Sequence, residues 1–96
     1  MKNDKIENIR IEIDKVDYQL LELFNHRARL VVQLAEIKKQ LDLKLFDPAR
    51  EQVIFRNMTS ANKGPLTADA IIRIYERIID ESRRLERIEV YNKKSE

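Results

Sequence analysis

Two basic residues, Arg27 and Lys38, are spaced so that their side chains can act together. They lie eleven residues apart in a segment without Gly or Pro. On an α-helix this spacing is about 16 Å of rise and close to a whole number of turns, so both side chains leave nearly the same face. Both side chains are long enough to bend toward each other. The gap between their charged groups would suit a small dianion.

Arg27 also interrupts an aliphatic series. Written as a seven-residue repeat, residues 1–41 place eleven positions on one seam, and ten of them are aliphatic: Ile6, Ile9, Ile13, Val16, Leu20, Leu23, Arg27, Leu30, Leu34, Ile37 and Leu41. A guanidinium stays protonated in proteins and is costly among apolar groups unless an anion meets it. The partner must come from another element, another chain or a ligand, and we favour a ligand. A structural ion pair with a protein carboxylate is the alternative.

Carboxylates and a hydroxyl recur at helical spacing further along the chain. Asp47 and Glu51 are one turn apart with Arg50 beside them, and Ser82 and Glu86 are also one turn apart. Carboxylates can accept hydrogen bonds from a ligand hydroxyl. Together with the two cations, these residues predict a polar cavity for a carboxylate ligand, without a nucleophile.

Arg10 is seventeen residues before Arg27, which is about 25 Å along a helix and about 100° around it. It cannot join the same small-molecule site from the same chain. If the first helix pairs antiparallel with a second copy, however, Arg10 of the partner can close the pocket.

Three helices and no strand are expected, so the fold class is all-α. The first helix runs from about Asp4 to about Asp42. The second starts at Asp47 and Pro48, an N-cap followed by a favourable first residue, and ends near Ser60. The third opens at Thr67 as N-cap, after the Gly64-Pro65 turn, with an apolar stripe at Ile71, Ile74, Tyr75, Ile78, Ile79, Leu85 and Ile88 that Ser82 interrupts.

The first helix is too long for a lone globule. Its roughly 38 residues span about 55–60 Å, whereas a compact domain of 96 residues has a radius of gyration of about 12–13 Å. We therefore expect one domain over residues 1–96 in an intertwined homodimer, with residues 1–4 and 92–96 frayed.

Composition excludes several classes. Lys and Arg number 19 against 17 acidic residues, and the two signs are mixed along the chain, which argues against nucleic-acid binding. There is no Cys and only one His, so a metal site is not expected. No signal peptide and no membrane span is recognised, and a cytoplasmic protein is expected.

The ordered set of motifs resembles the all-helical chorismate mutases. It comprises residues 9–17 (IRIEIDKVD), Leu20, Leu21 and Leu23, the spacing of Arg27 and Lys38, residues 46–51 (FDPARE) and residues 78–82 (IIDES). The Gly64-Pro65-Leu66 turn and the charged tail resemble versions fused to the first enzyme of aromatic biosynthesis. The resemblance implies a cofactor-free isomerase that converts chorismate to prephenate in the shikimate pathway.

The resemblance also implies roles for the residues. Arg27 and the partner's Arg10 would grip the two substrate carboxylates, and Lys38 would contact a carboxylate and the ether oxygen. The remaining roles would be hydroxyl binding by Asp47 and Glu51, carboxylate binding by Ser82, and a supporting charge from Arg50.

Glu86 stands where many relatives carry Gln beside the ether oxygen. A Gln amide donates a hydrogen bond at any pH, whereas a carboxyl must be protonated to donate one. A nearby acidic group would raise the pKa of Glu86 and Lys38 would lower it. We expect turnover to improve on acidification, with Arg27, Lys38 and Glu86 as the catalytic residues.

Three other readings remain open. A lyase on the same scaffold removes pyruvate from isochorismate, although the pair Asp47 and Glu51 favours the mutase. A non-catalytic regulatory module and a plain helical dimerisation domain are the other two. Taken singly, most of these polar residues could be surface charges, and Ser82 could bond to its own helix.

Overall fold

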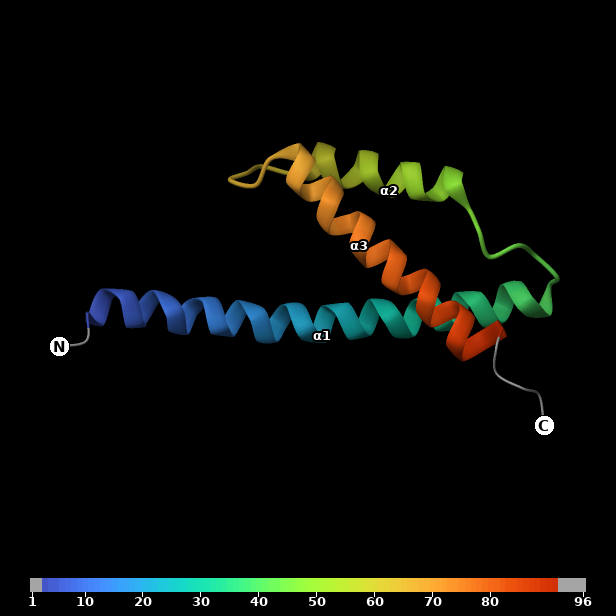
Figure 1. Ribbon diagram of the computed structural model, residues 1–96, viewed down its shortest axis with the longest axis horizontal. Helices are drawn as coiled ribbons and strands as arrows, with labels where there is room; N and C mark the ends of the chain where they lie inside the picture. The colour runs from blue at the N-terminus through green and yellow to red at the C-terminus, as the bar shows by residue number, and fades with distance from the viewer. Residues whose placement is uncertain (1–2, 92–96) are drawn as a thin grey trace. The chain divides into compact units, whose positions relative to one another are not determined.

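The computed structural model describes residues 3–91. The described chain is built of helices, in the order α1 (Asp4–Gln40), α2 (Pro48–Ala61), α3 (Ala68–Glu86) and the π-helix η1 (Arg87–Tyr91) (Figure 1). The prediction of an all-α chain with three helices and a very long first helix is confirmed. Within residues 3–91, no helix combines the length and apolar character that crossing a bilayer requires.

Helix α1 begins at a side-chain cap. The Oδ1 of Asn3 accepts hydrogen bonds from the backbone N–H groups of Lys5 and Ile6, at 3.0 and 3.4 Å. These bonds satisfy amides that have no partner within the first turn. Asn3 and Asp4 thus form the start of α1, and the expectation that residues 1–4 fray stays a prediction. Residues 1–2 and 92–96, where fraying was also expected, lie outside the described residues.

Helix α1 ends at Gln40, two residues before the predicted end at Asp42. Asp42 has a φ of 57°, in the left-handed region that ends helices and that Asp tolerates better than most residues. The N–H of Leu43 donates to the carbonyl of Lys38 at 2.8 Å, and the N–H of Asp42 to that of Lys39 at 3.2 Å. This pair of bonds is a Schellman motif, which satisfies carbonyls that the helix leaves open.

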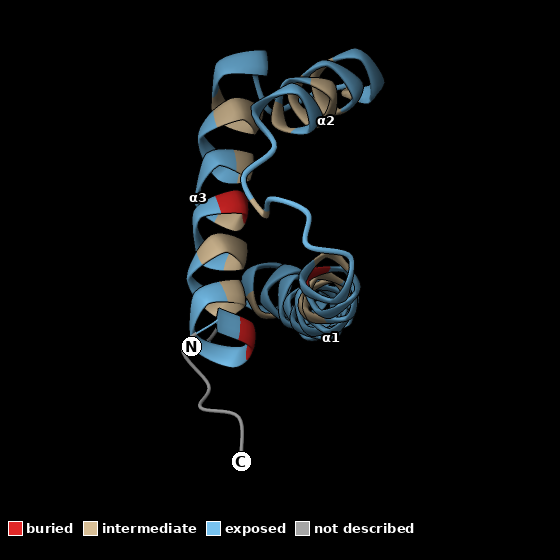
Figure 2. Ribbon diagram, turned by 90° about the vertical axis from the view of Figure 1, so that its right-hand side faces the viewer, coloured by how far each residue is buried: buried red, intermediate tan, exposed pale blue. Residues whose placement is uncertain are grey.

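The chain forms two compact units, residues 1–30 and 31–96, with the boundary inside α1. The prediction of one domain stays a prediction. In the first unit the aliphatic seam is exposed over its whole length, from Ile6 to Leu30. The buried apolar residues among those described, Ala35, Ile79 and Val90, all belong to the second unit (Figure 2).

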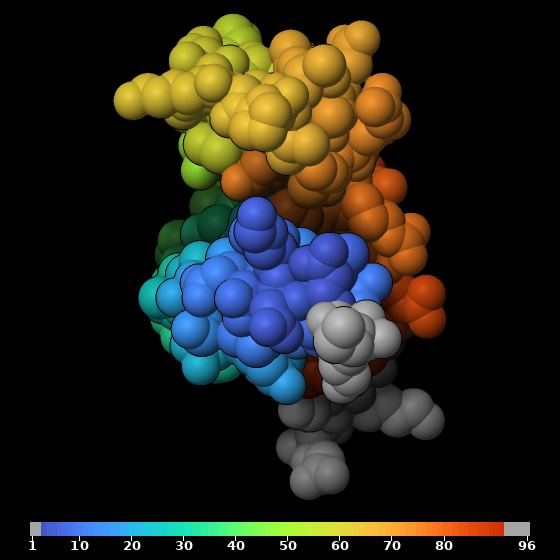
Figure 3. Space-filling view, turned by 90° about the vertical axis from the view of Figure 1, so that its left-hand side faces the viewer, coloured from blue at the N-terminus to red at the C-terminus, as the bar shows by residue number. Residues whose placement is uncertain are grey.

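In the second unit, α2 and α3 pack against each other beside the turn that joins them. Side chains from the end of α2 and the start of α3 gather in the yellow and orange region of Figure 3. The Oγ1 of Thr67 caps α3 by accepting the N–H of Ala70 at 3.1 Å, as predicted. Helix α2 ends at Ala61, one residue beyond the predicted Ser60. From their connection the two helices diverge (Figure 1).

The last turn changes the expected apolar stripe. The helical period predicts that Ile88 continues the buried face, but Ile88 is 50% exposed and Val90 is 6% exposed. Residues 87–91 form a π-helix, whose turn holds more residues than an α-helical turn. The wider turn shifts the register, so Val90 takes the inward position.

Candidate active site

Asp47 and Glu51 are positioned by the start of α2. The Oδ1 of Asp47 accepts the backbone N–H of Arg50 at 3.0 Å, which is the predicted N-cap. Pro48 follows at a position that needs no N–H donor. Glu51 lies one turn later and is half-buried, whereas Asp47 and Arg50 are exposed. The cap therefore fixes the backbone that carries both carboxylates.

Glu51 is bound by a residue of α3 that sequence reasoning did not place in the site. The Nε of Arg83 donates to Oε2 of Glu51 at 3.0 Å, and Nη2 of the same guanidinium donates to Oε1. The side chain of Glu51 is 19% exposed and that of Arg83 38%. The family resemblance assigned Glu51 to a ligand hydroxyl and gave Arg83 no role.

Two further groups hold Arg83. Its Nη1 donates to Oδ1 of Asp80 at 3.4 Å, and its guanidinium carbon lies 5.3 Å from the centre of the Phe46 ring. The hydrogen bond to Glu51 raises the pKa of Arg83 above its ordinary value; partial burial opposes this, and the charges of Glu51, Asp80 and Glu86 add to it. The guanidinium therefore remains cationic.

Ser82 and Glu86 follow on α3, and both are half-buried. The Oγ of Ser82 donates to the carbonyl of Ile78 at 2.9 Å, which is the local bond considered as the alternative to ligand binding. A hydroxyl oxygen that donates can still accept, so this bond does not use up its hydrogen-bonding capacity. Lys38, near the end of α1 in the same unit, is also half-buried.

The two arginines of the first unit differ in exposure. Arg27 is half-buried. Arg10 is exposed, and its Nη1 lies 3.2 Å from Oε1 of Glu7, one turn earlier on α1. That Arg10 and Arg27 share one binding site with the polar residues of the second unit stays a prediction.

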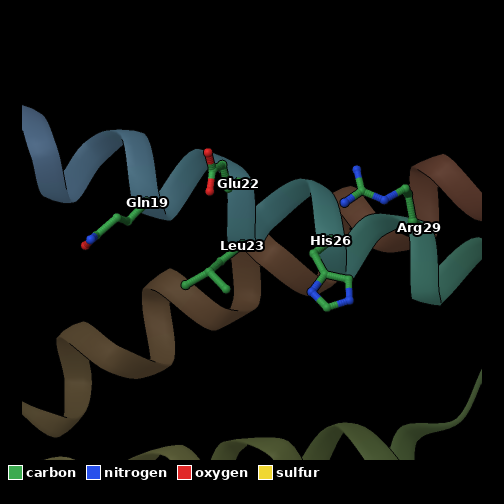
Figure 4. Close-up of a pocket in the computed structure, with 5 residues that line it drawn as sticks. All are labelled: Gln19, Glu22, Leu23, His26 and Arg29. Atoms are coloured by element: carbon green, nitrogen blue, oxygen red, sulfur yellow. The ribbon is translucent and has the colours of Figure 1, made fainter.

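An open pocket lies on α1 within the first unit. It is lined by Gln19, Glu22, Leu23, His26 and Arg29. In Figure 4, Leu23 and His26 leave the helix on one side, whereas Glu22 and Arg29 leave on the other. One helix cannot surround a ligand, and none of the predicted site residues lines this pocket. Within residues 3–91, no three His, Asp or Glu side chains gather into a potential metal site.

Comparison with known protein families identifies the family of this chain. The family model of chorismate mutase type II matches residues 9–87. This chain belongs to the chorismate mutase type II family. The predicted resemblance is thereby confirmed.

Several relatives extend the match. The chain is 34% identical over 88 residues to a bifunctional chorismate mutase/prephenate dehydratase of Aquifex aeolicus, covering 88% of this chain and 24% of that protein. It is 32% identical over 85 residues to a chorismate mutase of Methanocaldococcus jannaschii, covering 88% of this chain and 86% of the relative. The chain thus spans about a quarter of the length of the bifunctional relatives and most of the length of the shorter one.

Solved structures of chorismate mutases share the fold. One from Thermus thermophilus has a TM-score of 0.87 and 30% identity, covering 88% of this chain and 97% of that chain. One from Helicobacter pylori, in complex with prephenate, has a TM-score of 0.87 and 25% identity, covering 96% of this chain and all of that chain.

Within this chorismate mutase family member, the residue that sequence reasoning missed is Arg83. A signal was present, since Arg83 follows Ser82 directly and lies one turn after Asp80 and Ile79 on α3. Its partner, Glu51, is 32 residues earlier, and spacing within one helix could not connect the two.

Proposed function

We propose that this chain is a chorismate mutase, an isomerase of aromatic amino acid biosynthesis that converts chorismate to prephenate. The observation that carries the proposal is the extent of the similarity. The chain covers 86% of a chorismate mutase from M. jannaschii and all of an H. pylori chorismate mutase chain solved with prephenate. These relatives have little length beyond the matched part in which another activity could reside.

The reaction suits a site of fixed charges. In this one-substrate rearrangement a carbon–oxygen bond breaks while a carbon–carbon bond forms, and no base, nucleophile or covalent intermediate takes part. The protein contributes by holding the substrate in a compact, chair-like conformation. It also places positive charge or hydrogen-bond donors at the ether oxygen, which gains electron density in the transition state.

The substrate carboxylates are assigned to the cationic residues. Arg27 and Arg10 of a second copy grip the two carboxylates, Ser82 binds a carboxylate through its hydroxyl, and Arg50 adds a supporting charge. The half-buried positions of Arg27 and Ser82 support this assignment, since partial burial strengthens charged hydrogen bonds.

The reacting oxygen and the ring hydroxyl are assigned to the other polar residues. Lys38 and Glu86, both half-buried, serve the ether oxygen. Asp47 and Glu51 accept the ring hydroxyl from the first turn of α2. Because the cap bond of Asp47 uses only Oδ1, its carboxylate keeps capacity for a further donor.

A homodimer completes the proposal. The ten aliphatic residues of the seam, nine in α1 and Leu41 directly after it, are all more than 40% exposed, and α1 contains 37 residues. A second copy packed antiparallel along α1 would cover this seam, and would bring Arg10 of one chain to the middle of the other. Because so much apolar surface is costly in water, association is favourable.

One assay separates this function from its rivals. Purified protein is mixed with chorismate, whose ultraviolet absorbance is followed, and the product is converted by acid to phenylpyruvate; isochorismate is run in parallel. Turnover of chorismate alone supports the mutase. Turnover mainly of isochorismate with release of pyruvate identifies the lyase, and turnover of neither leaves a regulatory or dimerisation domain. A cytoplasmic location stays a prediction from the sequence.

A further inference from the structure

The Arg83–Glu51 pair bridges α2 and α3 where the two helices have diverged. Glu51 lies in the first turn of α2 and Arg83 in the last turns of α3, and the turn that joins the helices is at the opposite end of both (Figure 1). Two N–H groups of Arg83, Nε and Nη2, reach both oxygens of Glu51. A fork of this kind fixes the plane of the carboxylate as well as its position.

Arg83 is itself held on its other sides. The ring of Phe46 lies against the guanidinium, with the ring centre 5.3 Å from its central carbon, and Oδ1 of Asp80 accepts from Nη1 at 3.4 Å. Phe46 directly precedes Asp47, so this contact links the guanidinium to the backbone that carries the α2 cap. The guanidinium that binds Glu51 is therefore itself held by Phe46 and Asp80.

The fork leaves Glu51 able to bind a ligand. Each carboxylate oxygen offers about two acceptor positions, and the two N–H groups of Arg83 use one on each oxygen. Glu51 would otherwise have three rotatable bonds, and ordering such a side chain when substrate binds costs conformational entropy. Attachment to Arg83 removes that cost before the substrate arrives.

We propose that Arg83 is a positioning residue, which holds the carboxylate of Glu51 in the orientation that accepts the ring hydroxyl of chorismate. This inference rests on the proposed mutase function and adds a residue to it. Arg83 acts through Glu51 and does not touch the substrate. Selectivity for a ring that carries a hydroxyl is the property that the pair provides.

The test compares Arg83→Ala, Arg83→Lys, Glu51→Ala and the double variant Arg83→Ala/Glu51→Ala. The matched control is Arg77→Ala, which removes an arginine of the same helix that pairs only one turn away, with Glu81 at 2.8 Å. Each protein is assayed with chorismate and with an analogue in which hydrogen replaces the ring hydroxyl. Circular dichroism checks folding.

Arg83→Ala is expected to lower kcat/KM for chorismate about ten- to a hundredfold, mainly through KM, because the hydroxyl contact serves substrate and transition state alike. The loss is below about threefold on the analogue. In the Glu51→Ala background, the additional Arg83→Ala substitution is expected to cause no further loss of kcat/KM for chorismate. Arg83→Lys keeps the charge but loses the two-pronged hydrogen bonding, so its kcat/KM for chorismate is expected to fall between those of the wild type and Arg83→Ala. It takes the place of Arg83→Ala in the comparison if that variant does not fold. Arg77→Ala matches the wild type.

Four results overturn the inference while the mutase function stands. The first three are full activity in Arg83→Ala, equal losses on chorismate and the analogue, and an undiminished loss in the Glu51→Ala background, which would mean direct contact of Arg83 with substrate. Higher activity in Arg83→Ala would show that the fork sequesters Glu51, and it too overturns the inference. Absence of turnover by the wild type and Arg77→Ala defeats the proposed function, and the inference falls with it.

Discussion

The Nζ of Lys39 donates a hydrogen bond of 2.9 Å to the backbone carbonyl of Val90, and it lies 5.6 Å from the centre of the Tyr91 ring. These residues are 51 positions apart, so the contact ties the end of α1 to the π-helix. The π-turn places the Val90 side chain inward, and the Val90 carbonyl accepts a hydrogen bond from the charged ammonium group of Lys39. Such charge-assisted hydrogen bonds are stronger than neutral ones, so this bond strengthens the packing of the π-helix on α1.

Lys39→Met, which keeps the length of the side chain but removes the donor, is expected to lower the free energy of unfolding by about 1 kcal/mol. Urea unfolding followed by circular dichroism measures it, at one fixed protein concentration because a dimer gains stability with concentration. Lys44→Met, which changes an exposed lysine of the segment after α1, serves as the control. Equal midpoints for the two variants would mean that the Lys39 contact contributes nothing.

Capping and ligand binding by Asp47 are separable. Asp47→Ala removes the cap of α2 and should cost about 0.5–2 kcal/mol of stability, whereas Asp47→Ser keeps a capping oxygen and should stay close to the wild type. Both variants should bind chorismate less tightly if the carboxylate accepts the ring hydroxyl. Thermal unfolding and KM are measured side by side. A wild-type KM in Asp47→Ser would mean that Asp47 only caps α2 and does not bind the substrate.

A mixing experiment tests the donation of Arg10 across chains. Arg10→Ala and Lys38→Ala homodimers should each be nearly inactive. After the two are mixed and exchange subunits at random, half of the dimers are mixed and each has one intact site, so about a quarter of wild-type activity should return. If Arg10 serves the site of its own chain, one chain of each mixed dimer lacks Arg10 and the other lacks Lys38, and no activity returns.

Lys38 is expected to act in the transition state. Lys38→Ala should lower kcat by about a hundredfold or more while KM changes much less, because negative charge on the ether oxygen develops only as the bond breaks. Steady-state kinetics with chorismate gives both constants, and Lys44→Ala provides the comparison. A change confined to KM would assign Lys38 to carboxylate binding.

The pH profile tests Glu86. Only a protonated carboxyl can donate a hydrogen bond to the ether oxygen, so kcat should rise as the pH falls through the titration of Glu86. Glu86→Gln donates at any pH and should flatten the profile, while Glu89→Gln, at an exposed glutamate of the next turn, should keep the wild-type shape. A wild-type profile that is already flat between pH 5 and 8 would contradict the role of Glu86.

Helix boundaries were predictable where the signal is local. The caps at Asp47 and Thr67 were predicted from sequence, because each bonds to an amide three residues away and needs no other part of the chain. The end of α1 was placed two residues late, since Asp42 is not the usual residue for the left-handed position. The π-turn was missed because the helical period gives no sign of a change in register.

The sequence by itself determined the helices, the aliphatic seam with its single Arg27, and the residue types of the site, because these depend on short-range bonds and on periodicity. Only the tertiary structure decided that Glu51 is held by Arg83 and that Lys39 reaches Val90. Such pairs depend on how one helix is rotated and displaced against another, and that is set by packing between residues far apart in the chain. No spacing along one helix encodes it.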